Sequence, residues 1–159
     1  MEIYILRHGE AEMREEGKAD RDRKLTAAGK KDLKSVLKMA RKMGVAPQII
    51  LTSPLRRAQE TAAIASEVLH SKHVVETKTL LPGASPDQVW KEIGALPKVE
   101  SVLIAGHNPH LGSLIGLLLE VALMVDLKKG ALMRITTQSR LGPPRGVLKW
   151  LITPRLAKA

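Results

Sequence analysis

Three segments with histidine, arginine or hydroxyl side chains each follow a short apolar run: Arg7-His8-Gly9, Ser53 to Ala58, and Gly106-His107-Asn108-Pro109. In open α/β sheets, binding and catalytic sites form beyond the carboxyl ends of the strands. If the three apolar runs are strands of one sheet, their polar residues meet at one edge. This convergence of two histidines with two or three arginines predicts a site for an anionic group.

His8 has the chemistry of a covalent nucleophile. A neutral imidazole can attack phosphorus and form a phosphohistidine when a hydrogen bond from its other nitrogen fixes the tautomer. Gly9 permits close approach of a ligand to the backbone. Nearby guanidinium groups favour the neutral ring, because they repel a second positive charge. The tripeptide therefore predicts phosphoryl transfer with His8 as the attacking group.

Arginine supplies the matching charge for such a reaction. A phosphoryl group in transfer spreads negative charge over three oxygens, and catalysis depends mainly on positioning and electrostatic stabilisation. Planar guanidinium groups suit those oxygens in geometry and charge. Arg7 is one candidate, and either Arg56 or Arg57 is the second. An isolated arginine on a helix is usually a surface residue, so its convergence with the histidines is what favours a role.

His107 is the second candidate imidazole. When protonated, it would bind a phosphate oxygen as a further cation, and Asn108 would add a neutral donor. The helix that Pro109 is expected to open has a positive end, which also favours anions. No role is indicated for the remaining histidines, His70, His73 and His110.

Strand-like and helix-like segments alternate along the chain and would position these residues. Apolar runs typical of strands occupy residues 3–6, 48–51, 74–78, 102–105, 132–137 and 147–153. Amphipathic segments typical of helices follow Thr26, Ser53 and Asp87, and another helix begins at Pro109. Thr26 is expected to cap a helix that runs to about Met43, and Ser53-Pro54 to begin one that runs to about Leu69.

This alternation predicts an α/β domain with helices covering a mostly parallel sheet of about six strands. The short turn Gly142 to Gly146 implies that the last two strands pair antiparallel, at an edge of the sheet. Glu10 to Lys24 is densely charged and lacks apolar periodicity, so we expect a mobile, solvated loop whose position after the first strand also suits a lid.

Length and composition set further limits. The 159 residues predict one domain, 1–159, and the absence of Phe predicts an aliphatic core. The absence of cysteine excludes disulfides, thiolate metal sites and cysteine nucleophiles. The N-terminal residues have no signal-peptide pattern, and the apolar stretch 111–125 is broken by Glu120 and shorter than the ~20 residues of a membrane span. We therefore expect a cytoplasmic protein without a membrane partner.

Taken in order, these motifs resemble the histidine phosphatase superfamily, and specifically its small phosphohistidine phosphatases of the SixA type. Arg7-His8-Gly9 resembles the RHG nucleophile motif, and Ser53-Pro54-x-x-Arg57-Ala58-x-x-Thr61 resembles the block with the second phosphate arginine. Gly106-His107-Asn108-Pro109-x-Leu111 is similar to the block with the second histidine. Asp20-x-x-Arg23-x-Leu25-Thr26-x-x-Gly29 is similar to another block, although Lys24 stands where proline is common.

The resemblance spans essentially the whole chain and implies a three-layer α/β/α, phosphoglycerate mutase-like fold. It selects Arg57 over Arg56. It implies His8, Arg7, Arg57 and His107 as the catalytic set, with substrate contacts also from Gly9, Arg23 and Asn108. No cofactor and no metal are expected, because arginines and histidines would perform the charge neutralisation that Mg²⁺ performs elsewhere, and no carboxylate cluster accompanies them.

Two departures from the phosphoglycerate mutase branch affect the expected substrate. That branch has an asparagine where this chain has Arg14, and it carries a general-acid glutamate in an insertion that is here the short loop Leu80 to Gly83. Expelling an alkoxide requires an acid, whereas a P–N bond releases an imidazole, a better leaving group. We therefore expect a phosphohistidine protein as substrate, with small phosphomonoesters as the alternative. Glu10 and Glu12 are candidate proton donors.

A net charge of +10 motivates a non-enzymatic alternative, a basic nucleic-acid-binding module that uses the lysine-rich segment Lys30 to Lys42. The chain has only three aromatic residues for base stacking, Tyr4, Trp90 and Trp150, and no recognised nucleic-acid motif. A third alternative, a non-catalytic phosphate-binding member of the family, conflicts with the intact set of two arginines and two histidines. We expect no nucleic-acid partner.

Overall fold

Six strands and five α-helices alternate along the chain in the computed structural model, which describes residues 1–159. The strands are β1 (Glu2–Arg7), β2 (Ile49–Thr52), β3 (Val74–Glu76), β4 (Ser101–Gly106), β5 (Leu132–Thr137) and β6 (Gly146–Ile152). The helices are α1 (Ala27–Lys42), α2 (Arg56–Leu69), α3 (Pro86–Ala95), α4 (His110–Leu119) and α5 (Pro154–Ala157), with short 3₁₀ turns η1 (Asp20–Asp22) and η2 (Lys78–Leu80).

The strands form one sheet in the order β3-β2-β4-β1-β5-β6. Strands β1, β2, β3 and β4 run parallel, so the ends of β1, β4 and β2 lie next to one another at one edge. Strand β5 pairs antiparallel with β1, and β6 pairs antiparallel with β5. The predictions of a mostly parallel sheet and of an antiparallel pair of late strands at its edge are both confirmed.

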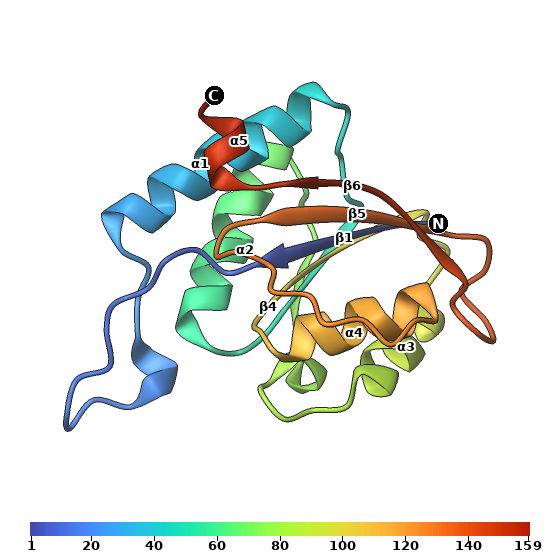
Figure 1. The fold of residues 1–159 in the computed structure, drawn as a ribbon, viewed down its shortest axis with the longest axis horizontal. Helices are drawn as coiled ribbons and strands as arrows, with labels where there is room; N and C mark the ends of the chain where they lie inside the picture. The colour runs from blue at the N-terminus through green and yellow to red at the C-terminus, as the bar shows by residue number, and fades with distance from the viewer.

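Alternating side chains of β1 divide the core between the two faces of the sheet, as the period of a strand requires. Ile3 and Ile5 pack in a cluster with α3 and α4, whereas Tyr4 and Leu6 pack in a second cluster with α1 and α2. Figure 1 shows the resulting three layers, with α1, α2 and α5 on one side of the sheet and α3 and α4 on the other. The core is almost entirely aliphatic, as the absence of Phe predicted.

Thr26 caps α1 as predicted, because its hydroxyl accepts a hydrogen bond from the Gly29 N–H at 3.0 Å. The predicted start of α2 is wrong. Ser53 and Pro54 form a turn, in which the Ser53 hydroxyl accepts from the Leu55 N–H at 3.3 Å, and the helix begins at Arg56. The third strand is also shorter than predicted and ends at Glu76, because Thr77 caps the 3₁₀ turn η2 through the Thr79 N–H.

No helix of the structure combines the length and the apolar character that crossing a membrane requires.

Candidate active site

His8 and His107 lie side by side because their strands are neighbours in register. Arg7 of β1 is paired with Gly106 of β4, and the His8 N–H donates to the Gly106 carbonyl at 3.0 Å. The two imidazole rings that follow have centroids 5.1 Å apart and are tilted by 54°. Both residues are buried, with 7% and 3% of their surface exposed. The parallel pairing of β1 with β4 therefore brings together two residues that are 99 positions apart in the sequence.

The tautomer of His8 follows from its backbone contact. The Nδ1 atom lies 2.7 Å from the Gly9 carbonyl oxygen, which can only accept, so Nδ1 carries the proton and Nε2 keeps a free lone pair. Burial lowers the pKa of His8 to about 4, and the charges of Arg57, Arg7 and Lys129 act in the same direction, against the effect of the Gly9 contact. At neutral pH the ring is therefore uncharged and its Nε2 carries a free lone pair.

His107 is also neutral in the unliganded protein. Its pKa is lowered to about 3, mainly by burial and in addition by the neighbouring His8 and Arg57. Neither ring nitrogen of His107 has a hydrogen-bonding partner among the protein groups. The expected role of His107, binding a phosphate oxygen as a cation, therefore requires the ring to take up a proton. In this environment a bound anion must supply the stabilisation that keeps such a proton on the ring.

Arg57, in the first turn of α2, is held by two acceptors of Asp20, its backbone carbonyl and its carboxylate. Its Nη1 donates to the Asp20 carbonyl at 2.9 Å, and its Nη2 donates to the Asp20 carboxylate at 3.1 Å. The residue is 6% exposed, and its Nε makes no hydrogen bond with the protein. Arg56, the competing candidate, is exposed and pairs with Glu60 on the surface of the helix. The structure thus places Arg57, not Arg56, beside the two histidines.

Arg7 is held from the opposite side by the segment before β5. Its Nη1 donates to the Leu127 carbonyl at 2.5 Å and lies 3.5 Å from the Asp126 carboxylate. Its Nε is buried and has no acceptor. Asn108 donates from Nδ2 to the same Leu127 carbonyl at 3.3 Å, so its amide N–H group anchors this segment. Arg7 and Arg57 therefore each keep a buried N–H donor that an anion can satisfy.

The glycines of two motifs allow the backbone segments around His8 to pack closely. A Cβ on Gly29 would overlap the backbone oxygen of Glu10, and a Cβ on Gly9 would lie 2.7 Å from Leu33. The Gly9 N–H also donates to the Thr61 hydroxyl at 3.2 Å, which in turn donates to the Arg57 carbonyl at 2.7 Å. Helices α1 and α2 are thereby fixed against the turn that carries His8.

The charged loop 10–24 is exposed over residues 13–19, as expected for a solvated segment. Its ends are tied down, because Ala11 forms a β-bridge with Leu25 and Arg23 donates to the Glu12 carbonyl at 2.6 Å. Arg23 also donates to the Asp20 carboxylate at 2.9 Å, so this carboxylate joins Arg23 to Arg57. Arg23 thus reaches the site through Asp20, the first residue of the Asp20-to-Gly29 motif, for which the sequence indicated no role.

The two candidate proton donors make their contacts away from the imidazoles. The Glu10 carboxylate lies 3.4 Å from the Thr26 hydroxyl, and the Glu12 carboxylate accepts from the Lys24 N–H at 3.3 Å. Neither carboxylate has a hydrogen bond to His8 or His107. The loop at residues 80–83 contributes no acid, as the sequence shows.

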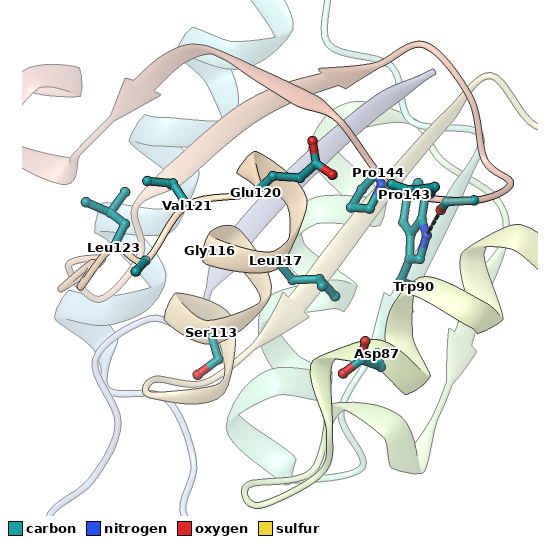
Figure 2. Close-up of a pocket in the computed structure, with 12 residues that line it drawn as sticks. Asp87, Trp90, Ser113, Gly116, Leu117, Glu120, Val121, Leu123, Pro143 and Pro144 are labelled. Carbon is teal, nitrogen blue, oxygen red and sulfur yellow. Dashed lines mark hydrogen bonds between the residues drawn. The ribbon is translucent and has the colours of Figure 1, made fainter.

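A separate hollow of about 700 Å³ lies between α3, α4 and the turn before β6 (Figure 2). Trp90 borders it and donates from its indole N–H to the Gly142 carbonyl at 2.8 Å, and Pro143 and Pro144 lie beside the Trp90 ring. None of the predicted site residues lines this hollow. The candidate site is instead the cationic edge at the ends of β1, β4 and β2.

A parallel sheet edge with a neutral, oriented imidazole and buried guanidinium donors defines a class of proteins that bind and transfer phosphoryl groups. The family model of the histidine phosphatase superfamily (branch 1) matches residues 3–81. An uncharacterized protein of Picosynechococcus sp. is 34% identical over 114 residues, which cover 70% of this chain and 69% of the relative. The chain belongs to the histidine phosphatase superfamily.

Solved structures agree with this assignment. The protein histidine phosphatase SixA complexed with tungstate superposes with a TM-score of 0.85 and 25% identity, covering 98% of each chain. A phosphoserine phosphatase from Entamoeba histolytica in complex with 3-phosphoglyceric acid gives a TM-score of 0.68 at 18% identity, also over 98% of each chain. The predicted phosphoglycerate mutase-like fold of the SixA type is confirmed, and the family supports phosphatase activity.

Proposed function

We propose that the protein is a metal-independent phosphatase that removes phosphoryl groups from phosphohistidine on a protein, through a phosphohistidine intermediate on His8. The observation that carries the proposal is the pairing of two neutral imidazoles, His8 and His107, near Arg57, which is buried, and Arg7, whose Nε is buried. Their charges suit the three oxygens of a transferring phosphoryl group.

In the first step, the Nε2 lone pair of His8 forms a bond to phosphorus while the P–N bond of the substrate breaks. The substrate ring carries a proton on its non-phosphorylated nitrogen, so it departs as a neutral imidazole, while phosphorylated His8 keeps the proton on Nδ1. Arg7 and Arg57 stabilise the charge on the equatorial oxygens, and His107 adds a third contact once the anion stabilises its proton. In the second step, water attacks phosphorus, the bond to His8 breaks, and orthophosphate leaves with His8 again neutral.

Two observations support a P–N substrate over an ester. Neither Glu10 nor Glu12 hydrogen-bonds to the imidazole pair, and Asp20, the carboxylate that contacts Arg57, has a lowered pKa and stays ionised, so these groups are poorly suited to protonate an alkoxide. An imidazole leaving group needs less assistance. The loop Leu80 to Gly83 is also short and carries no acid, which would leave room for a histidine side chain carried by another protein.

The test is a comparison of rates on a phosphohistidine protein and on p-nitrophenyl phosphate, with and without a chelator. We expect higher kcat/KM on the phosphohistidine protein and no loss of activity with the chelator. A strong preference for the ester would overturn the substrate assignment, and loss of activity on chelation would overturn the metal-independent mechanism.

The nucleophile is tested by His8→Ala, which should lower kcat by about 10³-fold or more and abolish acid-labile phosphate on the enzyme. His73→Ala is the matched control, because His73 is exposed and lies outside the site. Full activity in the His8 variant would refute covalent catalysis at this residue.

A further inference from the structure

A groove of about 570 Å³ beside the candidate active site is strongly cationic. It is bordered by loop 128–129, α5 and α1. Four basic side chains line it, namely Lys128, Lys129, Arg155 and Lys158, and Asp32 is the one acidic side chain among the lining residues. The groove contains no aromatic side chain.

Two of the four cations have no acidic partner. Lys158 pairs with Asp32 at 2.9 Å, and Lys128 pairs with Asp126 at 2.7 Å. Lys129 and Arg155 are exposed and form no ion pair. The groove therefore carries an excess of positive charge that the protein itself does not neutralise.

Gly130 connects this groove to the end of β1. Its N–H donates to the Arg7 carbonyl at 3.1 Å and to the His8 carbonyl at 3.0 Å. On its other side, a Cβ on Gly130 would lie 3.4 Å from Pro154, the first residue of α5. Figure 1 shows α5 against α1 on this side of the sheet. One residue thus separates the strand end that carries His8 from the wall of the groove.

We propose that this groove docks acidic side chains of the phosphoprotein substrate, next to the phosphohistidine that is delivered to His8. The proposal rests on the proposed function. Its basis is charge complementarity, because carboxylates on the substrate surface match the two unpaired cations, Lys129 and Arg155. A nucleic acid would match the charge too, but the groove offers no aromatic surface for its bases.

The test uses two synthetic peptides of equal length, each chemically phosphorylated on one central histidine. One peptide carries Glu and the other Gln at positions three, four and seven residues from the histidine. We expect the protein to favour the Glu peptide by about 3- to 10-fold in kcat/KM at low salt, from two surface ion pairs. The preference should shrink at 0.5 M NaCl, because salt reduces the screening length to below about 10 Å and weakens ion pairs on the surface.

The variant Arg155→Gln/Lys158→Gln removes one of the two unpaired cations together with the partner of Asp32, so it should lose most of this preference. It should leave the rate on p-nitrophenyl phosphate unchanged, because it spares Lys129, whose charge acts on His8. Lys38→Gln/Lys42→Gln is the matched control. It removes the same charge from exposed positions of α1 outside the groove and should keep the preference.

The outcomes separate the two proposals. Turnover of both peptides with equal kcat/KM, or an equal loss of preference in both double variants, would overturn the groove and leave the phosphatase assignment intact. If neither peptide is turned over, the phosphohistidine substrate is overturned and the groove proposal with it. Stronger competition by a single-stranded DNA oligonucleotide than by an unphosphorylated Glu peptide of equal charge would assign the groove to nucleic acid.

Discussion

The Asp20 carboxylate is hydrogen-bonded to the Arg57 guanidinium, with 3.1 Å between Oδ2 and Nη2, while its other oxygen accepts from Arg23. This ion pair is partly buried, and Arg23 together with Arg57 lowers the pKa of Asp20. The Asp20 carboxylate thus already contacts the guanidinium that we propose binds the phosphoryl group of the substrate. Substrate phosphate therefore binds Arg57 in the presence of a competing negative charge.

Asp20→Asn should tighten the binding of orthophosphate by about 3- to 10-fold, because the amide keeps a hydrogen-bond acceptor and removes the repelling charge. The inhibition constant of orthophosphate against p-nitrophenyl phosphate measures this effect. Asp22→Asn is the control, since Asp22 is exposed in the same 3₁₀ turn. Weaker phosphate binding in Asp20→Asn would show instead that the carboxylate positions Arg57.

Stability should fall as the pH drops from about 7 to 5. The pKa values of His8 and His107 in the folded protein are about 4 and about 3, below the ordinary value of 6.5. In this pH window the unfolded chain takes up protons that the folded protein cannot accept. Each of the two histidines should therefore remove roughly 2 kcal/mol of unfolding free energy between pH 7 and pH 5.

Urea unfolding at pH 7, 6 and 5 tests this prediction by comparing the wild-type protein with His107→Gln. The variant should lose about 2 kcal/mol of the pH dependence. Glu2 and Asp20 do not obscure the comparison, because their lowered pKa values place their titration below this window. An unchanged pH dependence would contradict the neutral, buried state of His107.

Binding of a tetrahedral dianion should be coupled to proton uptake at His107. The unliganded ring is neutral at pH 6, and a nearby dianion raises its pKa by favouring the charged form. Tungstate affinity should therefore increase as the pH falls, by up to about tenfold per pH unit. Calorimetry in two buffers with different ionisation enthalpies measures the proton uptake. The same uptake in His107→Gln would assign the proton to another group.

Gly29→Ala should destabilise the protein by about 2 to 4 kcal/mol, because its Cβ would overlap the Glu10 backbone next to the nucleophile turn. We also expect reduced kcat/KM, since Glu10 follows Gly9. The urea midpoint and p-nitrophenyl phosphate kinetics measure the two effects. Lys30→Ala, at the exposed neighbouring position of α1, should change neither strongly. Wild-type stability in Gly29→Ala would contradict the close packing of these segments.

Local sequence was sufficient to predict the strands, the Thr26 cap and the position of the polar residues after the strands. Apolar runs and amphipathic periodicity reflect which side chains face the core, and that pattern is present in every short window of the chain. The local pattern predicted the wrong start for α2, because a serine hydroxyl can accept a hydrogen bond either as a helix cap or within a turn. Ser53 has the signature of a helix cap, but it stabilises the turn before α2.

The sequence by itself determined which reactive side chains follow the strands, namely the two histidines and two arginines on which the proposed chemistry depends. Only the tertiary structure decided how these groups are held and charged. Asp20 contacts Arg57 across 37 positions and Leu127 contacts Arg7 across 120, so no local pattern encodes either contact. The neutral state of His8 and His107 likewise arises mainly from burial, which exists only once the sheet and its helices have packed.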